Sequence, residues 1–505
     1  MNQRIMPILV ALAGIVVSIF IMLQVIFNPT GGLAGILKYA AVPLIAICFL
    51  TPKTGLIILC WVSFYADYYK KLAVYYGTSS MMTVMEVLAL SMAMVGAIIG
   101  GSVSQALIRG PVPDKTSRNL FLITMVITGL FLASGGDGMS GKVQNAVNSG
   151  LYLGLAAVIC YHLQDRESAL KLCRLQFWLG VPWVIWAARQ YFYGFTEMEW
   201  FYARKGFSPV LAGQMLGMEI PRPYGFGGSS SAYGVITYLF MFGVWHAMRF
   251  EKKRPFYWAG ALVFAGGLFV SMQRTILILP ILTFGAYLLF RTPGGVKFFY
   301  ASVVVALVSG ILASDLLLGG LGEANEKIRV EGTGWASKVV QVGTFADRLK
   351  GWTRLKKAKS YSLFGTGRSA DTSFGSDDYS HDVINRILIN YGLAGLGVTF
   401  WLLIWTARRV HGMVFKIRDP EDRDTLVFVV AVVGVNGIGA LMSGSNTGTV
   451  PINFVLATFI GLGAGVMRRN AEALEPLPDA ASPGTFESGH LRPTRAQFRL
   501  RPGKH

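Results

Sequence analysis

The sequence has little charge, and acidic side chains are the scarcer kind. Only 14% of its 505 residues are charged, against roughly a quarter in soluble domains. A chain with so few charges lacks the polar surface needed to face water on all sides, which excludes an ordinary soluble protein. Lys and Arg number 46 against 27 acidic residues, giving a formal net charge of +19. No basic–aromatic recognition module occurs among the loops, so nucleic acid is not an expected partner.

Cysteine is also scarce. The chain has Cys48, Cys60, Cys160 and Cys173, and none forms a Cys-x-x-Cys pair or lies in an exposed outer loop. This spacing predicts neither a disulfide framework nor a zinc site. Buried thiols that pack as small hydrophobic side chains are expected instead.

Long apolar stretches dominate the sequence, with 53% hydrophobic residues and a mean hydropathy of +0.49. A membrane-spanning helix needs about 20 mostly apolar residues. We therefore predict an all-α, polytopic transmembrane helix bundle of about 12–14 spans. The predicted spans are 6–27, 32–50, 54–66, 81–100, 119–134, 146–163, 175–193, 232–248, 255–271, 275–290, 298–316, 383–407, 425–441 and 452–467. Residues 1–471 thus form one transmembrane domain, and the polar tail 472–505 is expected to be disordered and cytoplasmic.

Basic residues in the short loops predict the orientation, because cytoplasmic loops carry an excess of Lys and Arg. With the spans above, the basic loops all fall on one side, which we assign to the cytoplasm. They contain Arg109, Lys115, Arg118, Arg166, Lys171, Arg174, Arg249, Lys252, Lys253, Arg254, Arg408, Arg409, Lys416, Arg418, Arg423, Arg468 and Arg469. Two long loops, about 194–231 and 317–382, then face outward. Long loops in compact proteins are often functional.

The second outer loop carries a dense cationic segment and is expected to be partly helical. No acidic residue lies between its cations, which are Arg348, Lys350, Arg354, Lys356, Lys357, Lys359 and Arg368. Trp352 and Leu355 stand at helical spacing among them, as in a helix lying at a membrane interface. Attraction to anionic headgroups is one explanation. The other, which we favour, is docking of a phosphate-bearing lipid, because arginine binds phosphate oxygens bidentately.

His381 follows this segment at the start of a predicted span. It is the one histidine of six that the predicted topology places at the outer surface. Imidazole moves protons well near neutral pH, so a catalytic or acceptor-orienting role is expected. Asp377, Asp378 and Asp382 lie close enough in sequence to form a metal site together with His381. Ordinary turn and helix-capping composition explains them better, and no metal is expected.

Two further arginines are candidates for the same outer site. Arg222 lies in a Pro- and Gly-rich stretch that stiffens the backbone and lets a ligand approach closely. Arg274 lies in a very short outer turn between two spans. Either a shared cavity or simple anchoring of the helix end explains its position.

Taken in order, these motifs resemble the bacterial O-antigen ligase and O-antigen polymerase superfamily. The matching elements are Arg222-Pro-Tyr-Gly225, Ser271-Met-Gln-Arg274, Arg348-Leu-Lys-Gly-Trp352, Gly365-Thr-Gly367, His381 and Gly392-Leu-Ala-Gly395. The resemblance covers about residues 222–400, and the earlier spans match only as generic hydrophobic helices. Asp382 departs from the pattern, since many members have Asn after the histidine.

The resemblance implies transfer of a glycan from undecaprenyl pyrophosphate, with no nucleotide sugar, metal or cofactor and with inversion at the anomeric carbon. Arg348 and Arg222 would hold the pyrophosphate, with Arg274 as a further candidate. His381 would orient or deprotonate the acceptor hydroxyl, so His381 and Arg348 are the expected catalytic residues. The implied location is the bacterial inner membrane, with the site facing the periplasm. Membrane lipids and a chain-length regulator are candidate partners.

Three functions remain open from the sequence. A polymerase would join lipid-linked repeat units of an exopolysaccharide or O-antigen. A ligase would move the finished glycan onto lipid A core or protein, using the same donor. We favour the polymerase because no appended protein-binding domain is visible. A transporter or lipid flippase is the third hypothesis, although Glu86 and Asp315, the few acids near spans, have no obvious buried partner.

Overall fold

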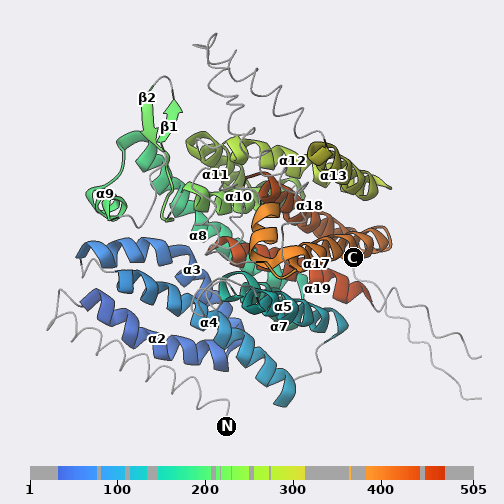
Figure 1. The fold of residues 1–505 in the computed structure, drawn as a ribbon, viewed down its shortest axis with the longest axis horizontal. Helices are drawn as coiled ribbons and strands as arrows, with labels where there is room; N and C mark the ends of the chain where they lie inside the picture. Colours follow the sequence, from blue (N-terminus) through green and yellow to red (C-terminus); the bar gives the residue numbers. More distant parts are fainter. Residues whose placement is uncertain are drawn as a thin grey trace, which may run out of the picture.

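The computed structural model describes residues 32–76, 81–108, 114–133, 146–205, 212–215, 218–228, 230–249, 255–271, 274–312, 363–365, 383–443 and 450–471. These residues are mainly helical (Figure 1). The helices are α2 (Gly32–Leu50), α3 (Pro52–Tyr76), α4 (Met81–Ile108), α5 (Lys115–Ala133), α7 (Tyr152–His162), α8 (Arg166–Tyr193), α9 (Glu197–Arg204), α10 (Gly234–Arg249), α11 (Pro255–Ser271), α12 (Arg274–Phe290), α13 (Gly295–Leu312), α17 (Val383–Val414), α18 (Pro420–Ser443) and α19 (Ile452–Ala471). A π-helical turn, Ala146–Leu151, leads into α7, and a 3₁₀ turn, Ser230–Tyr233, leads into α10.

Each predicted span that lies in the described residues is helical, so the helical bundle is confirmed. The predicted span 6–27 and the tail 472–505 lie outside the described residues. One predicted boundary was wrong: the span predicted to end at residue 66 continues, as helix α3, to Tyr76. The drop in hydropathy there comes from Asp67, Lys70 and Lys71. Their side chains are largely buried in the protein, so the helix does not end.

The first predicted outer loop, 194–231, contains a small element that the sequence did not predict. This loop contains helix α9 and a hairpin of two short strands, β1 (Ala212–Met215) and β2 (Met218–Pro221). The strands pair antiparallel, with Ala212 opposite Pro221. A search for long apolar helices does not detect strands of four residues, which explains the omission.

Helix α8 is the hub of the bundle. Helices α2, α3 and α4 pack on one another, α10 packs on α11, and α19 packs on α7 and α18. Helix α8 contacts α3, α10, α11 and α19 and so joins these groups (Figure 1). Its Trp183 is fully buried, and so is Trp245 of α10, whose ring stacks on Phe428 of α18 at 4.3 Å between centroids. One large hydrophobic core results, with a small second cluster at Val74 and Tyr202.

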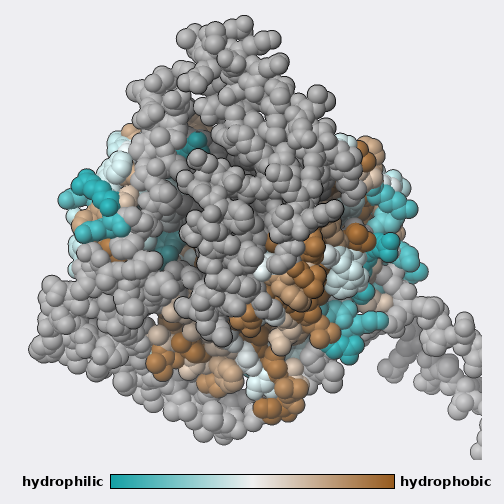
Figure 2. Space-filling model, viewed as in Figure 1, coloured by the Kyte–Doolittle hydropathy of each residue, from teal (hydrophilic) through white to brown (hydrophobic). Residues whose placement is uncertain are grey.

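Two described helical segments, Ala89–Ile108 in α4 and Ile452–Ala471 in α19, have the length and hydropathy of a membrane span. This supports membrane association by length and composition. Large hydrophobic side chains are also exposed on several helices, including Leu107 at 81%, Leu262 at 74% and Ile281 at 71%. Hydrophobic side chains gather below the centre of the face in Figure 2. Extensive apolar surface of this kind marks a lipid or protein contact rather than a water-facing surface.

Candidate functional site

Of the four predicted site residues, the structure describes one in full. Arg222 follows strand β2 directly and is half-buried. Arg274 is the first residue of helix α12, which begins one residue before the predicted span 275–290. Arg348 and His381 lie outside the described residues, and so does the proposed cationic helix around Trp352. The site can therefore be built upward from Arg222.

Residues 222–228, here called the Arg222 loop, form a tight and largely buried turn. Tyr224, Gly225 and Gly227 are buried, and the Gly227 amide donates to the Tyr224 carbonyl at 3.0 Å. Gly225 has φ of 59°, a conformation that side chains other than glycine rarely adopt. A Cβ there would also lie 2.9 Å from the carbonyl oxygen of Trp183. The glycine that the sequence motif singled out is thus required by both backbone conformation and contact with α8.

Gln190 of α8 holds the first half of the Arg222 loop. Its Oε1 accepts from the amides of Tyr224 and Gly225, both at 2.9 Å, and its Nε2 donates to the Gly225 carbonyl at 3.0 Å. The same Nε2 donates to the carboxylate of Glu199. Gln190 is only 1% exposed. One buried amide side chain therefore satisfies three backbone groups of the loop, which fixes its position against α8.

Glu199 anchors this arrangement from helix α9. Its carboxylate is fully buried and accepts from the Trp186 indole at 2.9 Å and the Thr196 amide at 2.7 Å. The Glu199 amide in turn donates to the Thr196 hydroxyl at 3.2 Å. Arg189 adds a charged contact at 3.8 Å. Glu199 was not among the residues predicted from the sequence, and the local signal that could have identified it is the Thr-x-x-Glu spacing of a helix capping box.

Helix α3 holds the second half of the Arg222 loop. The Lys71 ammonium donates to the carbonyls of Gly227 at 2.6 Å and Phe226 at 3.4 Å. It also lies over the Tyr224 ring, 4.0 Å from the centroid. The Asp67 carboxylate accepts from the Gly228 amide at 2.9 Å. Neither Asp67 nor Lys71 was among the residues predicted from the sequence. Their signal is a run of charges at i, i+3 and i+4 on one face of a helix.

Phe226 fixes the loop through packing. Its ring lies among Tyr65 and Tyr68 of α3 and Trp183 and Trp186 of α8, with ring centroids 4.8–6.5 Å away. These are the usual separations of interacting aromatic rings. The loop is therefore wedged between α3 and α8 by an apolar side chain as well as being held by hydrogen bonds.

Positive charge exceeds negative charge around the Arg222 loop. Among the charged side chains in the contacts described above, together with Arg222 itself, Lys70, Lys71, Arg189 and Arg222 are basic, and Asp67 and Glu199 are acidic. The Arg222 Nε is buried and has no hydrogen-bond partner among the described residues. Burial raises the pKa of Tyr224, with Glu199 adding to the effect, so the Tyr224 hydroxyl stays neutral. An arginine in such surroundings is suited to binding an anion.

Two glycine motifs of the second outer region meet in space. The Ala394 amide of α17 donates to the Leu363 carbonyl at 3.0 Å. Gly365, just beyond, has φ of 76°, and Gly392 interrupts α17 with φ of 65° and ψ of −162°. These turns free the Ala394 amide from helical bonding and point it at the segment 363–365. The start of the predicted Gly-x-Gly turn and the predicted Gly-x-x-Gly element are therefore neighbours.

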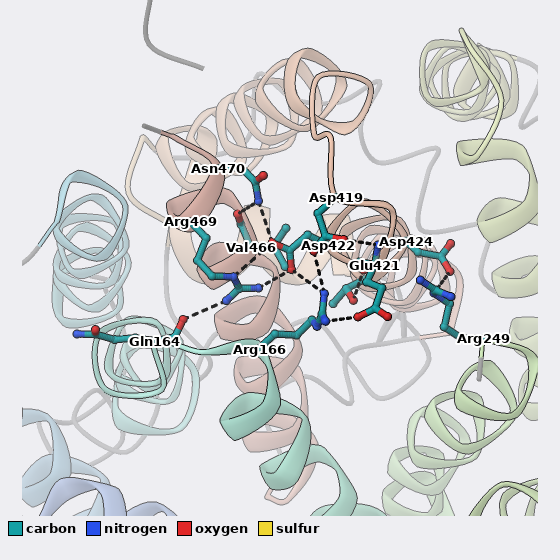
Figure 3. Close-up of polar contacts among 11 residues, drawn as sticks. Gln164, Arg166, Arg249, Asp419, Glu421, Asp422, Asp424, Val466, Arg469 and Asn470 are labelled. Carbon is teal, nitrogen blue, oxygen red and sulfur yellow. Dashed lines mark hydrogen bonds and ion pairs between the residues drawn. The ribbon is translucent and has the colours of Figure 1, made fainter. Parts of the chain in front are cut away.

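The far end of α8 carries a different polar cluster, shown in Figure 3. Arg166 pairs with Asp419, Glu421 and Asp422 at the start of α18, and Arg469 of α19 pairs with Asp422 at 2.7 Å. We call these five residues the ion-pair cluster. Asp424, the next acid along α18, pairs with Arg249 at 2.8 Å. Three of the basic loops predicted to share one side, those of Arg166, Arg249 and Arg469, therefore meet at the start of α18.

Burial acts to raise the pKa of Asp422, but its hydrogen bond and charge contact with Arg469 outweigh burial. The hydrogen bond from Asn470 and the charge of Arg166 act in the same direction. The pKa of Asp422 therefore lies below the ordinary value of an aspartate. Every carboxylate in the cluster has a basic partner, so we read the cluster as structural.

In comparisons with known proteins, no family model, no curated protein and no solved structure matches this chain. Its candidate site is therefore defined by its own residues.

Proposed function

We propose that this chain is a multi-pass membrane glycosyltransferase that polymerises undecaprenyl-pyrophosphate-linked repeat units of an exopolysaccharide or O-antigen. It acts on the periplasmic face of the bacterial inner membrane. One observation carries the proposal: Arg222 is presented on a loop clamped from two helices, where positive charge exceeds negative. A rigid, cationic site of this kind suits a phosphate-bearing donor.

The geometry of α8 supports the membrane part of the proposal. Arg166 begins the helix in the ion-pair cluster, and Gln190 near its other end holds the Arg222 loop. At about 1.5 Å per residue, these residues are roughly 36 Å apart. The hydrocarbon core of a bilayer is about 30 Å thick. Between them, Trp178 and Ile185 are 48% and 65% exposed, as expected for side chains that face lipid.

The proposed reaction joins two sugars and releases a lipid pyrophosphate. The acceptor hydroxyl oxygen attacks the anomeric carbon of the donor while the bond from that carbon to the pyrophosphate oxygen breaks on the opposite face. His381 receives the hydroxyl proton, and undecaprenyl pyrophosphate leaves with the bonding electron pair. Arg348 and Arg222, with Arg274 as a further candidate, would stabilise the negative charge that grows on the leaving group. One such donor is typically worth about 3–4 kcal/mol in the transition state.

The direct test incubates the purified protein in lipid nanodiscs with an undecaprenyl-pyrophosphate oligosaccharide. Longer lipid-linked glycans and released undecaprenyl pyrophosphate are the expected products. Arg348→Ala should abolish both while the protein still expresses and folds. Equal product from this variant would remove Arg348 from the site.

The same assay separates the other hypotheses. Transfer onto added lipid A core, without chain growth, would show that the protein is a ligase and not a polymerase. Movement of intact lipid-linked glycan across the membrane of sealed vesicles, with no new glycosidic bond, would show that it is a transporter and not an enzyme.

A further inference from the structure

The end of α3 holds two buried lysines that the proposed chemistry does not use. Lys70 is 7% exposed and pairs with Asp67, while Lys71 is fully buried. Removing an ammonium group from water is costly, and buried charges are seldom retained for stability alone. The Lys71 ammonium donates to two carbonyls of the Arg222 loop and lies over the ring of Tyr224.

The loop has sufficient apolar contact to remain attached without this lysine, because Phe226 is wedged among four aromatic rings. What packing alone leaves free is the orientation of the loop's backbone. Lys71 and Asp67 bind its carbonyls and amide at 226–228, and Gln190 binds residues 224 and 225. Two clamps at separate points leave little rotation of the segment.

Arg222 lies just before this clamped segment and is joined to it through Pro223. The proline ring fixes its own φ near −65° and restricts the residue before it to extended conformations. The backbone of Arg222 therefore takes its position from residues 224–228 on one side and from strand β2 on the other. A shift of the loop would move the guanidinium group with it.

We propose that Lys71, with Asp67, is a positioning residue that sets where Arg222 meets the donor phosphate. This inference rests on the proposed role of Arg222. It predicts that Lys71 acts on catalysis only through Arg222, whereas a residue that merely stabilises the fold would act independently of it.

The first test is a double-mutant cycle on kcat/KM for the lipid-linked donor. Lys71→Met should lower kcat/KM roughly 100-fold, as about 1 Å of misplacement can, and Lys71→Arg should restore part of it. In an Arg222→Ala background the same Lys71→Met change should cost less than about threefold, since its target is gone. Arg469→Met, which breaks a buried ion pair at the other end of the bundle, is the matched control and should leave the donor KM unchanged.

If Lys71→Met lowers kcat/KM by the same factor with and without Arg222→Ala, the two residues act independently and the proposal is overturned. If Arg222→Ala alone leaves activity intact, the proposed function of Arg222 fails instead, and the two failures are thus distinguishable.

The second test does not depend on activity. Amide hydrogen exchange in nanodiscs reports on the bonded amides of Tyr224, Gly225, Gly227 and Gly228. In Lys71→Met these amides should exchange at least about tenfold faster, while those of Ile452–Ala471 stay protected. Unchanged exchange in 224–228 would show that Lys71 does not hold the loop and would overturn the proposal.

Discussion

At the scale of single residues, the proposed reaction depends on charge and proton transfer at a few side chains. Arg222 is proposed to bind the donor phosphate, and His381 is proposed to take a proton from the acceptor. These two roles have different kinetic signatures. Loss of a phosphate ligand weakens the donor's interactions, whereas loss of a proton acceptor slows the chemical step after binding.

His381→Ala should therefore lower kcat by about 10²–10⁴-fold, the usual contribution of a general base, with little change in donor KM. The acidic limb of the pH–rate profile, where a histidine becomes protonated, should disappear with it. Steady-state assays from pH 5 to pH 9 measure both effects. The control is His411→Ala, a half-buried residue near the other end of α17. Identical pH profiles in parent and His381→Ala would argue against proton transfer.

At the scale of elements, the break in α17 decides where its first turns point. Gly392 has φ of 65° and ψ of −162°, a region open almost only to glycine. The break lets the Ala394 amide donate to the Leu363 carbonyl. This bond attaches the segment 363–365, which precedes His381 in the sequence, to helix α17, which follows it.

Gly392→Ala should destabilise this junction by about 1–3 kcal/mol, because alanine is strained in that conformation. Gly397 on the same helix is the matched control, since a Cβ there meets nothing within 4 Å. Gly397→Ala should be neutral or stabilising by up to about 1 kcal/mol. Thermal unfolding followed by tryptophan fluorescence compares the two. Equal stabilities would mean that the break is not required.

At the scale of the whole molecule, the ion-pair cluster joins helices distant in sequence. Asp422 is 6% exposed and holds Arg469 of α19 and Arg166 of α8 at the start of α18. Its lowered pKa means that the folded state favours the carboxylate. That stabilisation is fully present above the unfolded-state pKa, near 3.8, and is lost as the pH falls through the lower folded-state value.

Asp422→Asn should lower the free energy of unfolding at pH 7, by up to about 3 kcal/mol. The difference from the parent should shrink below pH 3.8, where the parent carboxylate protonates in the unfolded and then the folded state. Glu167→Gln removes an exposed ion pair and should change stability by less than about 1 kcal/mol. A difference that stays constant with pH would contradict the role assigned to Asp422.

The orientation of the bundle is also a whole-molecule property. A cysteine introduced at Ser376 should react with a membrane-impermeant maleimide added to intact cells, because the second long loop is predicted to face outward. The four native cysteines are buried and should stay unreactive. Labelling only after permeabilisation would show that the predicted orientation is wrong and that the proposed site faces the cytoplasm.

The sequence by itself determined the positions of the helices, because long apolar stretches have to leave water whatever their partners are. It also singled out the residues that the proposed function uses, since Arg222 and the glycines of the motifs stand out by type and order. It placed Gly225 in a motif without giving the reason, which is the contact with Trp183.

Only the tertiary structure decided what holds Arg222. Lys71 bonds to a residue 156 positions away and Gln190 to one 35 positions away, and both act on backbone groups. No local periodicity reports such bonds, because any segment offers the same carbonyls and amides. Lys71 lies beyond the predicted span 54–66 and was not predicted as a functional residue. Its role appeared once α3, α8 and the Arg222 loop were packed together.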